Sequence, residues 1–230
     1  MYNQLKRRVF DANIELANSG LVVGTWGNVS EIDRNLNVVG IKPSGVSYSN
    51  MKESDIVVID LEGNVVDGSL KPSSDTATHL EIYKNFDEVG GITHTHSTTA
   101  TGFAQAGVNA QALGTTHHDY FYGDVPVTRQ MTQEEIETDY ELNTGKVIVE
   151  TFVKNNINPM YVPAVLVNQH GPFTWGKSAK DSVFHGIVLE EVCKMNLTAV
   201  SLNSEILMNK HLQKKHFLRK HGENSYYGQK

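Results

Sequence analysis

The sequence contains little cysteine and no long apolar run, and each shortage excludes a class of protein. Its one cysteine, Cys193, cannot form an internal disulfide, which favours a reducing cytosol. Apolar runs such as 162–167 are far shorter than the roughly 20 residues that a membrane span needs. Residues 1–8 lead into a helical pattern and lack the apolar core of a signal peptide. We therefore expect a cytoplasmic protein with no membrane span.

An excess of positive charge is also missing. The formal net charge is −6, which argues against nucleic acid as a partner, because such proteins use many Lys and Arg contacts to phosphates. A small anionic substrate needs only local neutralisation and stays possible. The 230 residues, 39% of them hydrophobic, are typical of a globular protein and require no more than one domain, 1–230.

Helix and strand patterns alternate without an internal repeat or linker. Helices are expected over residues 5–18, 76–86, 98–105, 132–154, 178–200 and 203–220. Strands are expected over residues 21–23, 37–41, 56–61, 65–66, 91–96, 112–116, 125–128 and 164–167. This order predicts a single α/β domain with a largely antiparallel central sheet flanked by helices.

Three histidines form a candidate metal site. His94 and His96 stand two residues apart in a predicted strand, so both side chains project from the same face, and His170 follows another strand. Three histidines with an open position are typical of catalytic zinc sites, whereas structural sites usually contain thiolates. On spacing alone, a His-x-His pair is more often a pair of solvent-facing polar residues. Asp75 is a candidate fourth ligand or acid–base group.

Three pairs of small polar residues, Gly27-Asn28, Ser44-Gly45 and Ser73-Ser74, could bind an anion through backbone N–H and hydroxyl groups. One of these pairs, Ser73 and Ser74, precedes a predicted helix, whose N-terminus favours negative charge. The alternative for all three pairs is an ordinary turn. Lys42 could add a positive charge, and its alternative is a solvated lysine. The candidate substrate-binding residues are Gly27, Asn28, Lys42, Ser44, Gly45, Ser73 and Ser74.

Motifs spread over nearly the whole chain resemble one known family. They are Thr-Trp-Gly-Asn-Val-Ser (25–30), Ile-Lys-Pro-Ser-Gly-Val (41–46), Lys-Pro-Ser-Ser-Asp (71–75), Gly-Ile-Thr-His-Thr-His-Ser (91–97), Gly-Thr-Thr-His-His-Asp-Tyr-Phe (114–121) and His-Gly-Pro-Phe (170–173). Together with residues 216–222 and 226–229, they closely resemble the class II aldolase/epimerase family. Within it they look most like the L-ribulose-5-phosphate 4-epimerases.

The resemblance implies one zinc ion per subunit, with His94, His96 and His170 as ligands and Asp75 as a fourth ligand or close neighbour. The related fuculose-phosphate aldolases carry Glu where this chain has Asp75, which favours an epimerase. The implied activity interconverts L-ribulose 5-phosphate and D-xylulose 5-phosphate, with Asp119 and Tyr227 as the two proton-transfer groups. From sequence alone, the alternative for Asp119 is an ordinary loop aspartate, and the alternative for Tyr227 is an aromatic residue in a frayed C-terminus.

The C-terminal segment 203–230 is rich in basic residues. By resemblance it completes a neighbour's active site in a homotetramer, with His216 and Arg219 near the substrate; a solvated or subunit-facing helix is the alternative. His118, just before Asp119, departs from the family pattern and could alter the pKa of that carboxylate.

Two other functions remain open from the sequence. A class II aldolase would release its cleavage products, and a non-catalytic metal-binding module would show no turnover. No G-x-G-x-x-G segment follows a strand, so a nicotinamide-dependent route to epimerisation lacks its usual binding motif. Manganese or cobalt could replace zinc at the same ligands.

Overall fold

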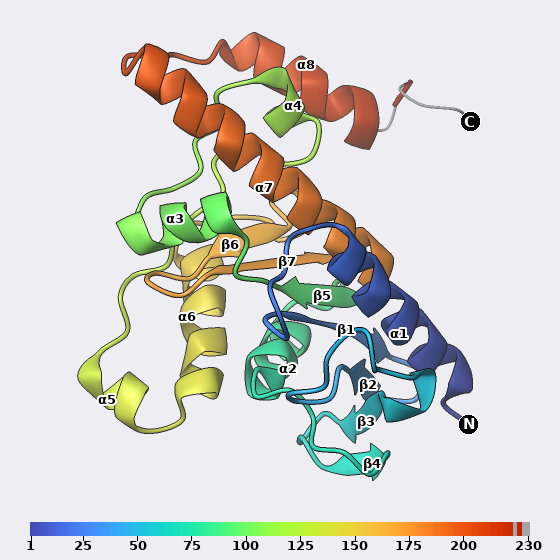
Figure 1. The fold of residues 1–230 in the computed structure, drawn as a ribbon. Coiled ribbons are helices and arrows are strands. Elements are labelled where there is room, and N and C mark those ends of the chain that lie inside the picture. The colour runs from blue at the N-terminus through green and yellow to red at the C-terminus, as the bar shows by residue number, and fades with distance from the viewer. Residues whose placement is uncertain (223–224, 227–230) are drawn as a thin grey trace.

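A seven-stranded sheet forms the centre of the computed structural model, which describes residues 1–222 and 225–226 (Figure 1). The strand order is β4-β3-β2-β1-β5-β7-β6, and all neighbouring strands pair antiparallel. The strands are β1 (Asn28–Asp33), β2 (Val38–Ile41), β3 (Val57–Asp60), β4 (Val65–Asp67), β5 (Gly91–His94), β6 (Ala164–Leu166) and β7 (Pro172–Gly176). The predicted α/β domain with an antiparallel sheet is confirmed.

Eight α-helices and one short 3₁₀ helix accompany the sheet in the described part of the chain. They are α1 (Asn3–Asn18), η1 (Glu53–Asp55), α2 (Thr76–Asn85), α3 (Thr98–Ala106), α4 (Thr115–His118), α5 (Gln133–Glu137), α6 (Tyr140–Lys154), α7 (Ala179–Leu202) and α8 (Lys210–His221). None of the helices in the described residues is both long and apolar enough to cross a membrane.

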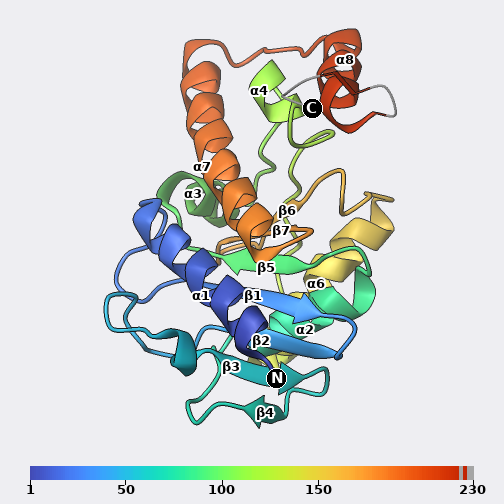
Figure 2. The same cartoon turned by 90° about the vertical axis from the view of Figure 1, so that its right-hand side faces the viewer.

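Helices cover both faces of the sheet. Helices α1 and α7 pack on one face, and the paired helices α2 and α6 lie on the other (Figures 1 and 2). Alternation along β2 shows how the sequence produces these layers, since Val38 packs with Leu5 and Val9 of α1 while Val39 joins the opposite core with Tyr83 of α2. The sheet is therefore a buried scaffold from whose strand ends the connecting loops emerge.

The strand predictions were wrong at several places. Residues 21–23 and 112–116 form no strand, and 125–128 makes only isolated bridges, while the central strands β1 and β7 were not predicted. Strand β1 looks polar in sequence, but Asn28, Ser30 and Glu31 are buried and have partners that are distant in the sequence. Ser30, for example, lies 2.7 Å from Nδ1 of His79.

Two predicted helices are shorter or broken. The region 132–154 begins with the predicted capping box between Thr132 and Glu135, but it splits into α5 and α6 at Thr138. Asn143 stabilises this break, because its Nδ2 donates to the backbone oxygen of Glu135 and to the hydroxyl of Thr138. The predicted helix over 203–220 begins only at Lys210, where Asn209 caps it.

Helix α3 has an unusual N-terminal cap. Its N-cap residue, Ser97, makes no side-chain cap bond, and the buried carboxylate of Glu190 on α7 instead accepts the amides of Thr99 at 3.0 Å and Ala100 at 2.9 Å. We expect Glu190→Gln to lower the free energy of unfolding by about 1–3 kcal/mol, because an amide places N–H groups against these donors. Urea denaturation measures the change.

A neighbouring glutamate provides the matched control. Glu191 is exposed and pairs with Lys194, so Glu191→Gln should change stability by less than about 0.5 kcal/mol. Burial raises the pKa of Glu190, but the amides of Ala100 and Thr99 lower it overall. Its stabilisation is therefore present above the unfolded pKa of about 4.3 and is lost as the pH falls below it. Equal stability of the two variants would contradict this capping role.

Candidate active site

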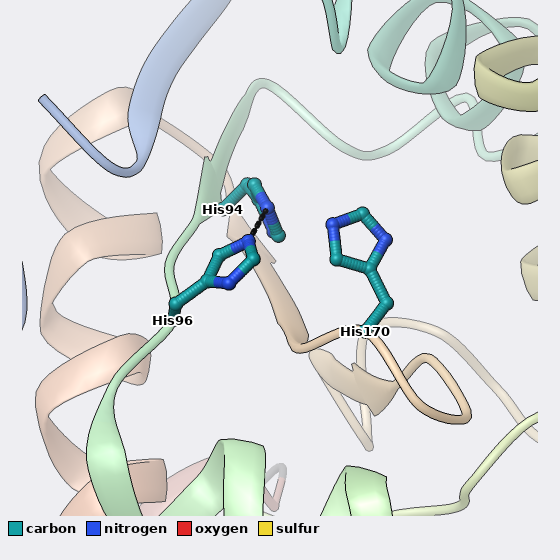
Figure 3. Close-up of side chains that lie close together, drawn as sticks. All are labelled: His94, His96 and His170. Atoms are coloured by element: carbon teal, nitrogen blue, oxygen red, sulfur yellow. Dashed lines mark hydrogen bonds between the residues drawn. The ribbon is translucent and has the colours of Figure 1, made fainter.

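Three histidines converge beside the end of β5. His94 is the last residue of β5, His96 follows in the loop to α3, and His170 lies in the turn between β6 and β7 (Figure 3). Their candidate ligand nitrogens all lie within 4.8 Å of one another. Within the described residues, no other group of three or more histidine, cysteine, aspartate or glutamate side chains meets this criterion. The predicted convergence is confirmed, although the strand ends before His96.

Hydrogen bonds fix the orientation of His94. Its Nδ1 lies 3.0 Å from the backbone oxygen of Pro172, and a carbonyl can only accept, so Nδ1 carries the proton and Nε2 has a free lone pair. Nε2 of His94 lies 3.1 Å from Nε2 of His96. Two nitrogen ligands about 2.0–2.1 Å from a tetrahedral zinc stand roughly 3.3 Å apart. The pair therefore has the spacing of two ligands of one ion.

The imidazoles are also in the protonation state that a metal requires. Burial lowers the pKa of His94 and of His96. Burial and the neighbouring His94 and His96 lower the pKa of His170 to about 3. Neutral imidazoles offer lone pairs at neutral pH, so a divalent cation need not displace protons from charged rings.

Asp75 lies beside the cluster but outside the three-histidine set. Its Oδ2 accepts a hydrogen bond of 2.6 Å from Nδ2 of Asn28. Burial tends to raise the pKa of Asp75, but His94, His79 and the bond from Asn28 lower it overall, so the carboxylate stays ionised. The other amide atom, Oδ1 of Asn28, is buried and has no hydrogen-bond partner among the described residues. A ligand in the cleft can supply that partner.

A single cleft contains the predicted metal ligands and most of the predicted substrate contacts. It is lined by Gly27, Asn28, Lys42, Ser44, Gly45, Ser73, Ser74, Asp75, His94, His96 and His170. Gly27 is required there, because its φ is +95° and an added Cβ would stand 2.7 Å from the backbone oxygen of His94. Sequence segments that are far apart therefore form one site.

Possible donors for an anion also line this cleft. The side chain of Lys42 is buried, and its Nζ lies 3.4 Å from the backbone oxygen of Pro43 and 4.9 Å from the centre of the Tyr48 ring. Among the described residues no carboxylate pairs with Lys42, and burial lowers its pKa. A buried ammonium with so few partners is well suited to bind an anion.

The serine pairs supply fewer amide donors than their sequence suggested. The amide of Ser44 donates to the backbone oxygen of Lys71, and that of Ser73 donates to Lys42. These two bonds hold the two segments side by side. The amides of Gly45 and Ser74 donate to none of the residues that the structure describes, and Ser74 directly precedes Asp75, the N-cap residue of α2. The donors left for an anion are therefore Lys42, the serine hydroxyls, these two amides and the helix N-terminus.

Asp119 lies in a different part of the chain, where α4 meets α8. One oxygen accepts Nε of Arg219 at 3.0 Å and faces Nδ1 of His216 at 3.1 Å, and the other accepts Nη2 of Arg219 at 2.6 Å. Burial tends to raise the pKa of Asp119, but Arg219, His216 and Lys220 lower it overall. The structure thus joins three predicted site residues to one another. They do not line the histidine cleft, and α4 and α8 lie toward the far end of α7 (Figure 1).

Two further residues were linked to Asp119 by the sequence, His118 and Tyr227. The side chain of His118 is buried, and burial lowers its pKa, so it stays neutral next to Asp119. The groups that hold the pKa of Asp119 low are those of α8. The other predicted proton-transfer residue, Tyr227, lies outside the described residues.

Comparison with known proteins identifies the family. Residues 7–197 match the model of the class II aldolase and adducin N-terminal domain. The chain belongs to this class II aldolase family. The matched range includes the histidine cluster, the segments 27–28, 42–45 and 73–74, and Asp119, but it ends before α8.

Solved class II aldolase structures share the fold over almost the whole chain. An L-fuculose 1-phosphate aldolase is 27% identical, with a TM-score of 0.76 over 93% of this chain and 94% of that one. The L-fuculose 1-phosphate aldolase of Glaciozyma antarctica PI12 is 23% identical, with a TM-score of 0.75 over 94% of this chain and 80% of that one. YgbL of Klebsiella pneumoniae, described only as a candidate aldolase, epimerase or decarboxylase, is 22% identical. Its TM-score is 0.70, over 94% of this chain and 98% of that one.

Some residues that line this cleft were not predicted, and two of them come from α6. Tyr140 and Glu141, at the beginning of α6, line the cleft beside the histidines. In the sequence they fall inside one long helical pattern, and nothing there indicates the break at Thr138 that brings them to the site. The fold of the region, rather than a motif, places them.

Proposed function

We propose that this protein is a zinc-dependent L-ribulose-5-phosphate 4-epimerase that acts in an oligomer. The observation that carries the proposal is the convergence of His94, His96 and His170 in the cleft that also contains the buried Lys42. A metal site and an anion site in one cleft suit a small phosphorylated sugar. The motifs described above support a phosphorylated ketopentose, with D-xylulose 5-phosphate as the product.

The residues present fit zinc. All three ligands are imidazoles, the pair distance of 3.1 Å suits one ion, and Asp75 adds a negative charge nearby. When bound, the ion supplies Lewis-acid stabilisation of the negative charge that develops on the sugar oxygens as a carbon–carbon bond breaks. His94, His96 and His170 hold it, and Lys42 and the amides of Gly45 and Ser74 hold the phosphate.

The chemistry of the reaction determines which other groups are needed. Carbon 4 of the ketopentose is not adjacent to the carbonyl, so its hydrogen is not acidic and deprotonation cannot invert it. Cleavage between carbons 3 and 4, rotation of the aldehyde and re-addition can invert it. Proton transfer is then required on both faces of the aldehyde. We assign this role to Asp119 and Tyr227, with His216 and Arg219 placing the Asp119 carboxylate.

The distance between these groups within one chain supports a shared site. Asp119, His216 and Arg219 do not line the histidine cleft, and α4 and α8 lie apart from the end of β5 (Figure 1). Under this proposal a second copy therefore brings its α4 and C-terminal segment 203–230 to the cleft. Cyclic assembly of identical chains satisfies this requirement at every site. A homotetramer with its active sites between subunits is therefore part of the proposal.

A sugar-phosphate aldolase is the second candidate. The similarity to L-fuculose 1-phosphate aldolase, at 27% identity over nearly the full length of both chains, favours it. Both activities require the same bond cleavage, and they differ in whether the aldehyde leaves. The shorter carboxylate of Asp75, where the fuculose-phosphate aldolases are expected to carry Glu, favours the epimerase.

A coupled assay separates the two functions. Incubation with L-ribulose 5-phosphate should produce D-xylulose 5-phosphate with little free aldehyde, and chelation should abolish turnover until zinc is restored. Product is measured by chromatography and aldehyde by an NADH-linked reductase. Stoichiometric release of aldehyde without D-xylulose 5-phosphate would show a lyase instead.

A further inference from the structure

We infer that Tyr140 is a positioning residue for the metal ligand His170. Its hydroxyl oxygen lies 3.3 Å from Nδ1 of His170, and the two ring centres are 6.1 Å apart with a 33° tilt. The inference rests on the proposed function, because it concerns the binding of the zinc ion. It adds a residue to the site that no motif of the sequence indicated.

The contact determines which nitrogen of His170 is available. One ring nitrogen of His170 points toward His94 and His96, and the other points away from them (Figure 3). When Nδ1–H donates to the tyrosine oxygen, the proton stays on that nitrogen and the lone pair of Nε2 faces the cluster. In the same way, the backbone oxygen of Pro172 accepts Nδ1–H of His94 and leaves Nε2 of His94 free. For His170 the partner is a side chain, which substitution can remove.

Other contacts hold the tyrosine itself in place. The hydroxyl of Thr144 donates to the backbone oxygen of Tyr140 at 2.8 Å, and the hydroxyl of Thr78 on α2 donates to that of Glu141 at 2.6 Å. Helices α2 and α6 approach closely, since a Cβ added to Gly145 would stand 2.5 Å from Cβ of Glu81. The helix preceded by Asp75 and the helix that begins with Tyr140 are therefore one packed unit beside the metal site.

The expected result is a selective loss of metal affinity. Tyr140→Phe keeps the ring and removes only the hydroxyl, so we expect the zinc dissociation constant to rise roughly 10–100-fold. Competition with a chromophoric chelator measures this constant, and the visible spectrum of the cobalt-substituted protein reports the ligand geometry. The melting temperature of the metal-free protein should stay within about 2 °C, because the hydroxyl is only partly buried.

A second tyrosine serves as the matched control. Tyr161 is half-exposed and lies in an aromatic group with Tyr122 and Phe217, and it does not line the histidine cleft. Tyr161→Phe should therefore leave the zinc constant within about twofold of wild type. Gly145→Ala moves Tyr140 instead of removing its hydroxyl. The added methyl group should push α6 away from α2 and weaken zinc binding without changing a ligand.

A double-mutant cycle distinguishes positioning from a general packing effect. If Tyr140 acts through His170, then Tyr140→Phe should have little further effect on metal affinity in a His170→Asn background. An undiminished effect there, or wild-type affinity in Tyr140→Phe alone, would overturn the inference. Failure of the wild-type protein to bind zinc at all would instead overturn the proposed function, so the two failures can be told apart.

Discussion

Replacing His94 with asparagine is expected to remove both the metal and the activity. His94 is the most buried of the three candidate ligands, and its Nδ1 is fixed by the backbone oxygen of Pro172. Loss of one of three ligands should reduce zinc to well below one ion per chain, and turnover should fall at least about 10³-fold, because the ion stabilises the charge of the cleavage step. Metal analysis and the epimerase assay on the same sample measure both.

A histidine elsewhere controls for nonspecific effects. His211 is exposed at the beginning of α8, so His211→Asn should retain zinc and turnover. The phenyl ring of Phe173 stacks on His94 with ring centres 4.2 Å apart, and asparagine fills only part of that space. Circular dichroism should therefore confirm that the variant is folded. Full turnover by folded, metal-free His94→Asn protein would exclude a Lewis-acid role.

Mixing two inactive variants is expected to restore activity. Asp119→Asn should keep its zinc, because Asp119 lies away from the histidine cleft, and should lose turnover about 10²–10⁴-fold through the lost proton transfer. If each site combines the cleft of one chain with Asp119 of the next, a random 1:1 mixture with His94→Asn has about one intact site in four. Co-expression with two affinity tags and successive purification yields the mixed oligomer for the assay.

The size of the recovery tests where the site lies. A site contained in a single chain would give no recovery, because every chain in the mixture carries a defect. Since Asp119 also binds Arg219, Asp119→Asn could loosen α8, so size-exclusion chromatography must show an unchanged assembly. No recovery in a mixed oligomer of correct size would exclude the shared site.

Local patterns predicted most of the fold, and the errors have a common cause. The helices α1, α2, α3 and α7 have clear periodicity or end signals, and they form where expected. Strand β1 was missed because its burial depends on partners remote in sequence. Its Glu31 accepts the amide of Ala179, and its Val29 amide donates to Asn13. No local window contains such pairs.

The parts of the candidate site that were predicted are those indicated by the types of residue present. Three histidines without spare thiolates indicated a metal, and the small polar pairs indicated an anion site. The sequence could not show that the amides of Ser44 and Ser73 bind neighbouring backbone, or that Tyr140 faces His170, because both depend on how distant segments pack. The group formed by Asp119, His216 and Arg219 was expected only from the family resemblance.

The central position of β5 has a consequence for the order in which the protein assembles. Residue 94 pairs with residue 28 of β1 and with residue 173 of β7, so the three histidines come together only after stretches of roughly 65–80 residues have closed. Such nonlocal pairing depends on the hydrophobic sheet and its helices rather than on an ion. Unlike a zinc finger, which needs its metal in order to fold, this chain is expected to form its pocket without a metal. Chelation should then remove a bound metal and leave the native structure in place.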